Sequence, residues 1–322
     1  MALQTHRQAV TSSHSRLGAM ALLLAGLLLN FGTASAAAAE QIELRQHTVL
    51  AAGHPLTVWE KSPAKPIAQL LLLHGRTWSS RPDFDLSVAG EDLSFMQGLN
   101  ALGYAVFALD ARGYGATPRD ASGWLTPNQA ATDATIVLHW LKARSPLPLH
   151  LFGWSYGAMI GQLVVQRDPG SAASLTLFGY PFDPSRHILA ADFAYPSRPP
   201  AVANTAANAA SDFIVPGSIS QAAIDAYVLA SLAADPLRVD FKNLHEWAEL
   251  DAGKINTPTL LLAGEFDPLT PAANLSAVFS TIAHPQRWWV VLPGGDHAAL
   301  LETPRKTMLR VMDSFIKTVD DR

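Results

Sequence analysis

The residues that could do chemistry centre on a serine between two glycines. Gly153-Trp154-Ser155-Tyr156-Gly157 follows an apolar run at residues 147–152, so we expect the serine on a tight turn between a strand and a helix. Side chains two residues before and two after the serine would clash in such a turn, and glycine at both places avoids this. The pattern predicts a nucleophilic hydroxyl held clear of the strand. An ordinary strand-to-helix turn is the alternative.

Acyl transfer by a serine also needs a base and an acid, and both follow predicted strands later in the chain. Asp267 follows the apolar run at residues 259–263, and His297 follows the run at residues 288–292. A histidine, with an ordinary pKa of about 6.5, can take the serine proton and return it to the leaving group. The aspartate would hold the imidazole in the right tautomer and stabilise the imidazolium. Asp183, which follows an earlier predicted strand, is the competing acid.

The elements that position these residues follow from the hydrophobic pattern. Continuous apolar runs predict strands buried on both faces and therefore a parallel sheet. Helical patterns of about ten to fifteen residues separate them, which indicates β-α-β units with right-handed crossovers. We therefore expect an α/β fold with a doubly wound, mostly parallel sheet. Strands are predicted at residues 41–62 (two strands around Gly53-His54), 68–73, 104–109, 147–152, 175–178, 259–263 and 288–292, and helices at residues 91–102, 128–143, 157–166, 271–282 and 304–319.

One long segment interrupts this alternation. Between Pro181 and Ile255 no buried-strand pattern occurs, and a Pro/Ala/Asn-rich stretch is followed by helical patterns at residues 220–233 and 241–250. Roughly seventy residues inserted between two sheet strands predict a helical lid over the carboxyl edge of the sheet. We expect an α/β core at residues 40–182 and 251–322 and the lid at residues 183–250.

With these elements in place, the chain resembles the α/β-hydrolase superfamily, in the branch that carries a helical lid after the sixth strand. The resemblance spans about residues 65–320 and rests on five motifs in the family's order: L-L-L-H-G, L-D-A-R-G-Y-G, G-W-S-Y-G, A-G-E-F-D-P-L-T-P and G-G-D-H. It implies a catalytic triad of Ser155, Asp267 and His297. It also implies an oxyanion hole formed by the backbone N–H groups of Arg76 and Tyr156, with Thr77 as the alternative to Arg76.

Other residues near these motifs are given supporting roles. Asp296, Asp110, Arg112 and His74 are expected to shape loops through hydrogen bonds. Some aromatic residues are expected to line an acyl pocket and others to form only the core of the lid. The candidates for contact with substrate are Trp78, Trp154, Phe193, Phe213 and Tyr227.

Residues 1–39 are interpreted as a secretory signal peptide. A mildly basic start is followed by an apolar run at residues 17–31 and by Ala34-Ser35-Ala36, a small-x-small cleavage site. The run is too short for a membrane span, and an uncleaved anchor is the alternative. The sequence contains no cysteine and therefore no disulfide. We expect a secreted or periplasmic protein.

Composition and charge narrow the class of function. A chain of 322 residues, 49% hydrophobic and 16% charged, has enough apolar material for a large core. The formal net charge of −4, without a Lys/Arg cluster, argues against a nucleic-acid partner. We expect a small-molecule acyl substrate and no metal or organic cofactor, because no ligand-spaced cluster occurs and a serine triad needs none.

The identity of the nucleophile narrows the class of reaction that the protein can catalyse. The turn that carries Ser155 is called the nucleophile elbow in α/β-hydrolases. Serine rather than aspartate at this elbow argues against the alkyl-enzyme chemistry of haloalkane dehalogenases and epoxide hydrolases. We expect a serine hydrolase that cleaves carboxylic esters through an acyl-enzyme. The alternatives are a proline-iminopeptidase-like peptidase, a lactone or carbon–carbon hydrolase, and a non-catalytic binding protein. The peptidase branch usually has His-Gly-Gly-Pro-Gly where this chain has His74-Gly75-Arg76-Thr77-Trp78.

Overall fold

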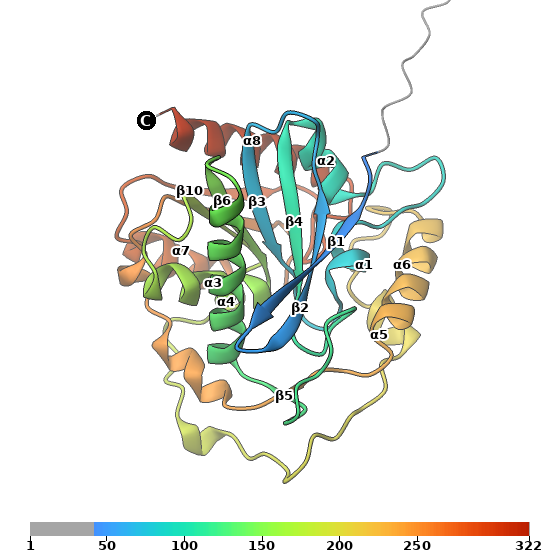
Figure 1. Cartoon of the computed structure of the whole chain (residues 1–322), viewed down its shortest axis with the longest axis vertical. Helices are drawn as coiled ribbons and strands as arrows, with labels where there is room; N and C mark the ends of the chain where they lie inside the picture. The colour runs from blue at the N-terminus through green and yellow to red at the C-terminus, as the bar shows by residue number, and fades with distance from the viewer. Residues whose placement is uncertain (1–41, 322) are drawn as a thin grey trace, which may run out of the picture. The chain divides into compact units, whose positions relative to one another are not determined.

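A computed structural model describes residues 42–321 and contains an eight-stranded sheet (Figure 1). The strand order is β1-β2-β4-β3-β6-β7-β9-β10, with β1/β2 and β2/β4 antiparallel and every other pair parallel. The mostly parallel sheet expected from the apolar runs is confirmed. Its strands are β1 (Arg45–Ala51), β2 (His54–Lys61), β3 (Ala68–Leu73), β4 (Tyr104–Asp110), β6 (Leu149–Trp154), β7 (Ser174–Phe178), β9 (Thr259–Gly264) and β10 (Arg287–Leu292).

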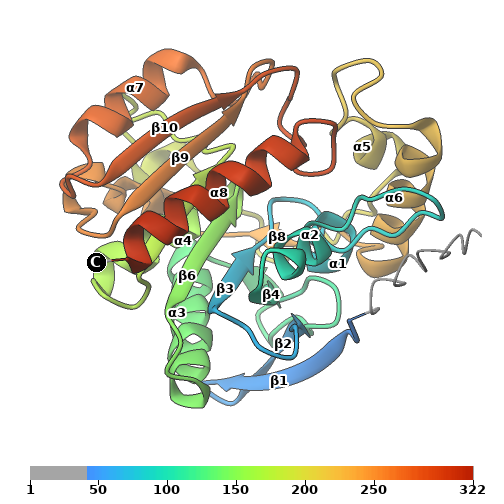
Figure 2. The ribbon, with the colours of Figure 1, turned by 90° about the horizontal axis from the view of Figure 1, so that it is seen from above.

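Helices cover both faces of this sheet (Figure 2). Alternate side chains of the central strands enter two separate cores. Leu71 and Leu73 of β3 pack with α3 (Pro127–Arg144) and α4 (Tyr156–Arg167). Leu70 and Leu72 point to the opposite face and pack with other helices. The latter core includes residues of α2 (Phe95–Ala101) and α8 (Arg305–Asp320), whereas α7 (Ala272–Thr281) contributes to the former.

The chain leaves the main sheet after β7 and returns to it at β9. The inserted residues contain η1 (Ala190–Asp192), α5 (Ala206–Ala210), α6 (Gln221–Ala234), η2 (Leu244–Glu249) and η3 (Ala252–Lys254). They also contain β8 (Asp240–Phe241), which pairs with β5 (Trp124–Leu125) outside the main sheet. In Figure 1, α5 and α6 lie together beside the short helix α1 (Ser80–Phe84). The residues expected to form a helical lid lie in this insertion.

Two predicted helices differ from the structure. The helix predicted from residue 91 begins at Phe95, because the Ser94 hydroxyl caps it by accepting the Gln97 N–H at 3.0 Å. The helix predicted at residues 241–250 is instead β8 followed by the 3₁₀ helix η2. Between them Asn243 adopts a left-handed conformation with φ of 56°, which a continuous α-helix does not allow.

The predicted signal peptide lies outside the described residues. Among residues 42–321, no helix combines the length and apolar character that crossing a membrane requires.

Candidate active site

Ser155 lies at the turn between β6 and α4, in a backbone conformation that non-glycine residues rarely adopt. Its φ and ψ are 55° and −115°, and its N–H donates to the Phe178 carbonyl at 2.8 Å. A Cβ added at Gly153 would lie 2.3 Å from the Gly157 carbonyl oxygen, and one added at Gly157 would lie 2.2 Å from the Leu73 oxygen. The steric reason for both glycines is therefore visible, and the strain is concentrated at the serine.

His297 and Asp267 meet although 30 residues separate them. The imidazole Nδ1 lies 2.8 Å from Asp267 Oδ2, and the carboxylate side chain is fully buried. The other oxygen of Asp267 accepts the Leu269 N–H at 2.9 Å, which fixes the carboxylate. The contact with Asp267 Oδ2 places the proton of the neutral His297 imidazole on Nδ1 and leaves Nε2 as the basic nitrogen.

His297 lies against the two strand ends that hold Ser155. The Trp154 indole N–H donates to the His297 carbonyl at 2.8 Å. A Cβ added at Gly179, just beyond β7, would lie 3.0 Å from His297 Cε1. The Ser155 N–H donates its hydrogen bond to Phe178, the residue before Gly179. The structure therefore brings Ser155, Asp267 and His297 to one edge of the sheet, at the carboxyl ends of β6, β9 and β10.

The two other aspartates considered from sequence are occupied elsewhere. Asp183 accepts from the N–H and hydroxyl of Ser185, at 2.9 and 2.7 Å, within its own turn. Asp296 is fully buried and accepts the N–H groups of Ala298, Ile214 and Val215, as expected for a residue that shapes a loop.

His74 follows β3 and orders the neighbouring loop as a neutral imidazole. Its Nε2 accepts the Ala111 N–H at 3.1 Å, so the ring proton is on Nδ1 and is donated to the Gly75 carbonyl at 2.8 Å. Burial lowers the pKa of His74 to about 4, an effect that the Gly75 bond partly opposes. The structural role expected for His74 agrees with these contacts.

Two backbone amides close to Ser155 are available to an oxyanion. Arg76 follows His74 and Gly75, and Tyr156 is the first residue of α4. Within residues 42–321, neither amide donates a backbone hydrogen bond. The Arg76 side chain is exposed and lies over the Phe241 ring at 4.6 Å. The Tyr156 ring also packs on Phe241, at 5.0 Å, and thus faces the insertion.

The five aromatic residues considered for substrate contact occupy different environments. Trp78, Trp154 and Tyr227 are 2%, 3% and 0% exposed and belong to the core on the α8 face of the sheet. Phe213 is half-buried against Tyr227, and Phe193 is half-buried and stacked on Tyr195. Phe213 and Phe193 thus retain exposed surface, whereas the other three are packed inside the protein.

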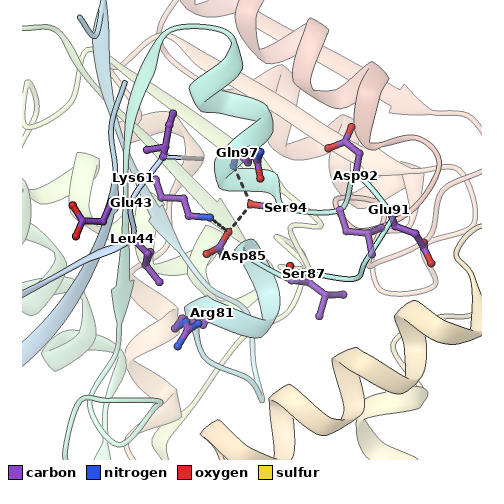
Figure 3. Close-up of a pocket in the computed structure, with 14 residues that line it drawn as sticks. Glu43, Leu44, Lys61, Arg81, Asp85, Ser87, Glu91, Asp92, Ser94 and Gln97 are labelled. Carbon is purple, nitrogen blue, oxygen red and sulfur yellow. Dashed lines mark hydrogen bonds and ion pairs between the residues drawn. The ribbon is translucent and has the colours of Figure 1, made fainter. Parts of the chain in front are cut away.

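A cavity between β2 and the residues around α1 and α2 is distinct from this site. This cavity of about 810 Å³ lies around Lys61, Asp85 and Ser94, where both Lys61 Nζ and the Ser94 hydroxyl donate to Asp85 Oδ1 at 2.6 Å (Figure 3). None of Ser155, Asp267 and His297 lines it.

A set of acidic residues beside the loop that follows β3 was not predicted from the sequence. Asp212 accepts the Trp78 indole N–H, Asp235 accepts the Ser79 N–H, and the Tyr227 hydroxyl lies between Asp212 and Asp83. Glu302, which accepts the Asp296 N–H, is a further buried acid. Burial raises the pKa of Asp212 to about 6, while the nearby charge of His297 acts in the opposite direction. No local sequence motif predicts these residues, because their hydrogen-bond partners are distant in the sequence.

The sheet topology and the strained elbow define the class, an α/β-hydrolase. A family model described as serine aminopeptidase, S33, matches residues 64–304, and the chain belongs to this family. It is a hydrolase of the α/β-hydrolase type. A comparison with curated protein sequences found no match.

Solved structures with the same fold include several hydrolases. A lipase in its open form is 19% identical, with a TM-score of 0.63 over 87% of this chain and 100% of the lipase. A membrane phospholipase A described as a bacterial virulence factor is 20% identical, with a TM-score of 0.63 over 87% of each chain. A hydrolase from Pseudomonas aeruginosa PA01 is 20% identical, with a TM-score of 0.60 over 86% of this chain and 99% of that one. At such identities the likeness shows the fold alone.

Proposed function

We propose that the protein is a serine hydrolase that cleaves carboxylic esters through an acyl-enzyme. The observation that carries the proposal is the contact of 2.8 Å between His297 Nδ1 and Asp267 Oδ2, at the same edge of the sheet as the strained Ser155. Membership of a hydrolase family supports the reaction type.

The first half-reaction follows from these positions. His297 Nε2 accepts the Ser155 proton as the serine oxygen attacks the ester carbonyl, and Asp267 stabilises the resulting imidazolium. The imidazolium then returns the proton to the departing alkoxide, which leaves as an alcohol. Water, deprotonated by the same imidazole, attacks the acyl-enzyme and releases the acid and the free serine.

The tetrahedral intermediates carry negative charge on the former carbonyl oxygen. We assign its stabilisation to the N–H groups of Tyr156 and Arg76, which have no other backbone acceptor within residues 42–321. Removing one such donor typically lowers the rate by about 10²–10³-fold in serine hydrolases. The alternative donor in the same loop is the N–H of Thr77.

A second candidate function is hydrolysis of an N-terminal peptide bond, which membership of the serine aminopeptidase family favours. The loop His74-Gly75-Arg76-Thr77-Trp78 argues against it, because the iminopeptidase branch carries a glycine-rich sequence there. Esters also make smaller demands on the site, since an alkoxide is a better leaving group than an amine anion.

A substrate panel separates the two functions. The mature protein is assayed with p-nitrophenyl esters of two to twelve acyl carbons and with proline and alanine p-nitroanilides at equal concentration. Faster turnover of an ester than of both anilides supports the proposal. Faster turnover of either anilide would replace it with the peptidase function.

We also propose that the protein acts outside the cytoplasm, since residues 1–39 have the order of a signal peptide: basic, apolar, then small residues. N-terminal sequencing of the protein exported from an expressing bacterium tests this. A mature terminus between residues 37 and 40 is expected; recovery of the intact N-terminus in the cytoplasm would contradict it.

A further inference from the structure

The insertion holds the loop of residues 74–79, hereafter the oxyanion loop, through two carboxylates. Asp235, at the end of α6, accepts the Ser79 N–H at 2.8 Å and the Gly115 N–H at 2.8 Å. Asp212, just after α5, accepts the Trp78 indole N–H at 3.1 Å. The last two residues of the oxyanion loop are therefore tied to side chains that lie more than a hundred positions later in the sequence.

A short stretch continues from Asp212 to the loop that carries His297. The N–H groups of Ile214 and Val215 donate to Asp296 Oδ2 at 2.6 and 3.0 Å. The Ser218 carbonyl accepts both the N–H and the hydroxyl of Thr303, each at 2.8 Å. Residues 212–218, which we call the clasp, thus contact the oxyanion loop through Asp212. The hydrogen bonds to Asp296 and Thr303 join the clasp to the loop of residues 293–304, hereafter the histidine loop.

Asp212 shares the Tyr227 hydroxyl with Asp83. The phenol oxygen lies 2.9 Å from Asp83 Oδ1 and 3.3 Å from Asp212 Oδ2. Burial raises the pKa of Asp83 well above its usual range, and the hydrogen bond from Tyr227 partly opposes this effect. Asp212 Oδ2 is thus within hydrogen-bond distance of two donors, the Tyr227 hydroxyl and the Trp78 indole N–H.

We propose that Asp212 is a positioning residue for catalysis: it fixes Trp78, and through it the oxyanion loop, at a set distance from His297. The clasp makes this possible, because its remaining bonds to Asp296 and Thr303 hold Asp212 relative to the histidine loop. Asp212 acts through Trp78 and not on the reacting atoms. The inference rests on the proposed serine-hydrolase function, which assigns an oxyanion to this loop.

Two substitutions at Asp212 distinguish position from charge. Asp212→Ala removes the acceptor for Trp78 and Tyr227, whereas Asp212→Asn keeps an acceptor oxygen and removes the charge. Asp225→Ala on α6 is the matched control, because the bond of Asp225 within the helix is to Gln221 and its side chain is exposed. Each variant is assayed for kcat and KM with p-nitrophenyl butyrate and for inhibition by an alkyl trifluoromethyl ketone, whose serine adduct carries an oxyanion.

For Asp212→Ala we expect kcat to fall about 10–100-fold with KM within twofold of wild type, the range expected for a misplaced catalytic loop. Affinity for the ketone should fall in proportion to kcat/KM, and Asp212→Asn should recover most of the loss. Trp78→Phe breaks the same contact from the other side and should reproduce the result if Asp212→Ala does not fold.

Three outcomes would overturn the inference: equal losses in Asp212→Asn and Asp212→Ala, a rise in KM with kcat unchanged, or ketone affinity equal to wild type. Ser155→Ala is measured alongside. If it retains activity, the proposed function fails; if it is inactive while Asp212→Ala and Trp78→Phe match the wild type, only the positioning role fails.

Discussion

Replacing Glu302 with glutamine should make the protein more stable at alkaline pH and leave it unchanged at acid pH. Glu302 is 3% exposed, and its Oε2 accepts the Asp296 N–H at 3.1 Å. Its Oε1 lies 2.6 Å from the Ser218 hydroxyl, which also lies 2.8 Å from the Val215 carbonyl. The Ser218 hydroxyl can donate to either oxygen, and when Glu302 is protonated it can donate to Ser218 while Ser218 donates to Val215. Glutamine offers the same pattern, one donor and one acceptor, without ionising.

The magnitude follows from the pKa of Glu302, which burial chiefly, together with Asp296, raises from 4.5 to about 7. Between these values the folded protein keeps a proton that the unfolded chain releases, so the free energy of unfolding falls as pH rises through the window. The contribution is fully present below pH 4.5 and lost above about pH 7. This difference in pKa corresponds to at most about 3 kcal/mol.

The assay is urea unfolding of wild type and Glu302→Gln at pH 5, 7 and 8.5. We expect a difference of less than about 1 kcal/mol at pH 5 and an advantage of about 3 kcal/mol for the variant at pH 8.5. Glu265→Gln is the control, since Glu265 is an exposed acid that accepts the Gly294 N–H of the same loop region. A constant difference between wild type and Glu302→Gln at all three pH values would refute the protonation argument.

Two further predictions concern the elbow and the acid. Gly157→Ala should destabilise the protein by about 3 kcal/mol or prevent folding, because the added Cβ would lie 2.2 Å from the Leu73 oxygen. The control is Gly161→Ala in the same helix, where the added Cβ meets only side-chain atoms. This variant should change the free energy of unfolding by less than about 1 kcal/mol. Equal stability of the two variants in urea would contradict this. Asp267→Asn should lower kcat about 10⁴-fold with the fold intact, whereas Asp183→Asn should leave kcat near wild type. A larger loss in Asp183→Asn would transfer the role of acid to that residue.

Much of the fold could be predicted because its signals are local. A strand buried on both faces needs a continuous apolar run, and the runs at β3, β4, β6, β7 and β9 are visible without knowing their neighbours. The run at β10 also predicts a strand, but this strand lies at the edge of the sheet and most of its residues are only half-buried. The elbow was equally accessible, since its five residues are consecutive and Gly153 meets its own turn, although Gly157 is needed because of the Leu73 carbonyl in β3. The meeting of Asp267 and His297 followed from their places after strands of one parallel sheet.

The rest depends on contacts that no local pattern encodes. The bonds from Trp78 to Asp212 and from Tyr227 to Asp83 join residues 134 and 144 positions apart. The same lack of local signal explains why the positions of the aromatic side chains could not be predicted. Residue type alone does not tell whether a ring lines a pocket or fills a core, and Trp78 and Tyr227 fill the core. The helix expected from residue 91 began late because a single serine hydroxyl capped it.

The proposed reaction depends most directly on Ser155 as the nucleophile. The decisive measurement is hydrolysis of p-nitrophenyl butyrate by purified wild-type protein and by Ser155→Ala, with thermal unfolding of both to verify the fold. We predict that the wild type hydrolyses the ester and that the variant falls to the rate of the buffer while unfolding at a similar temperature. Activity in Ser155→Ala within about tenfold of wild type would contradict the triad and the acyl-enzyme mechanism.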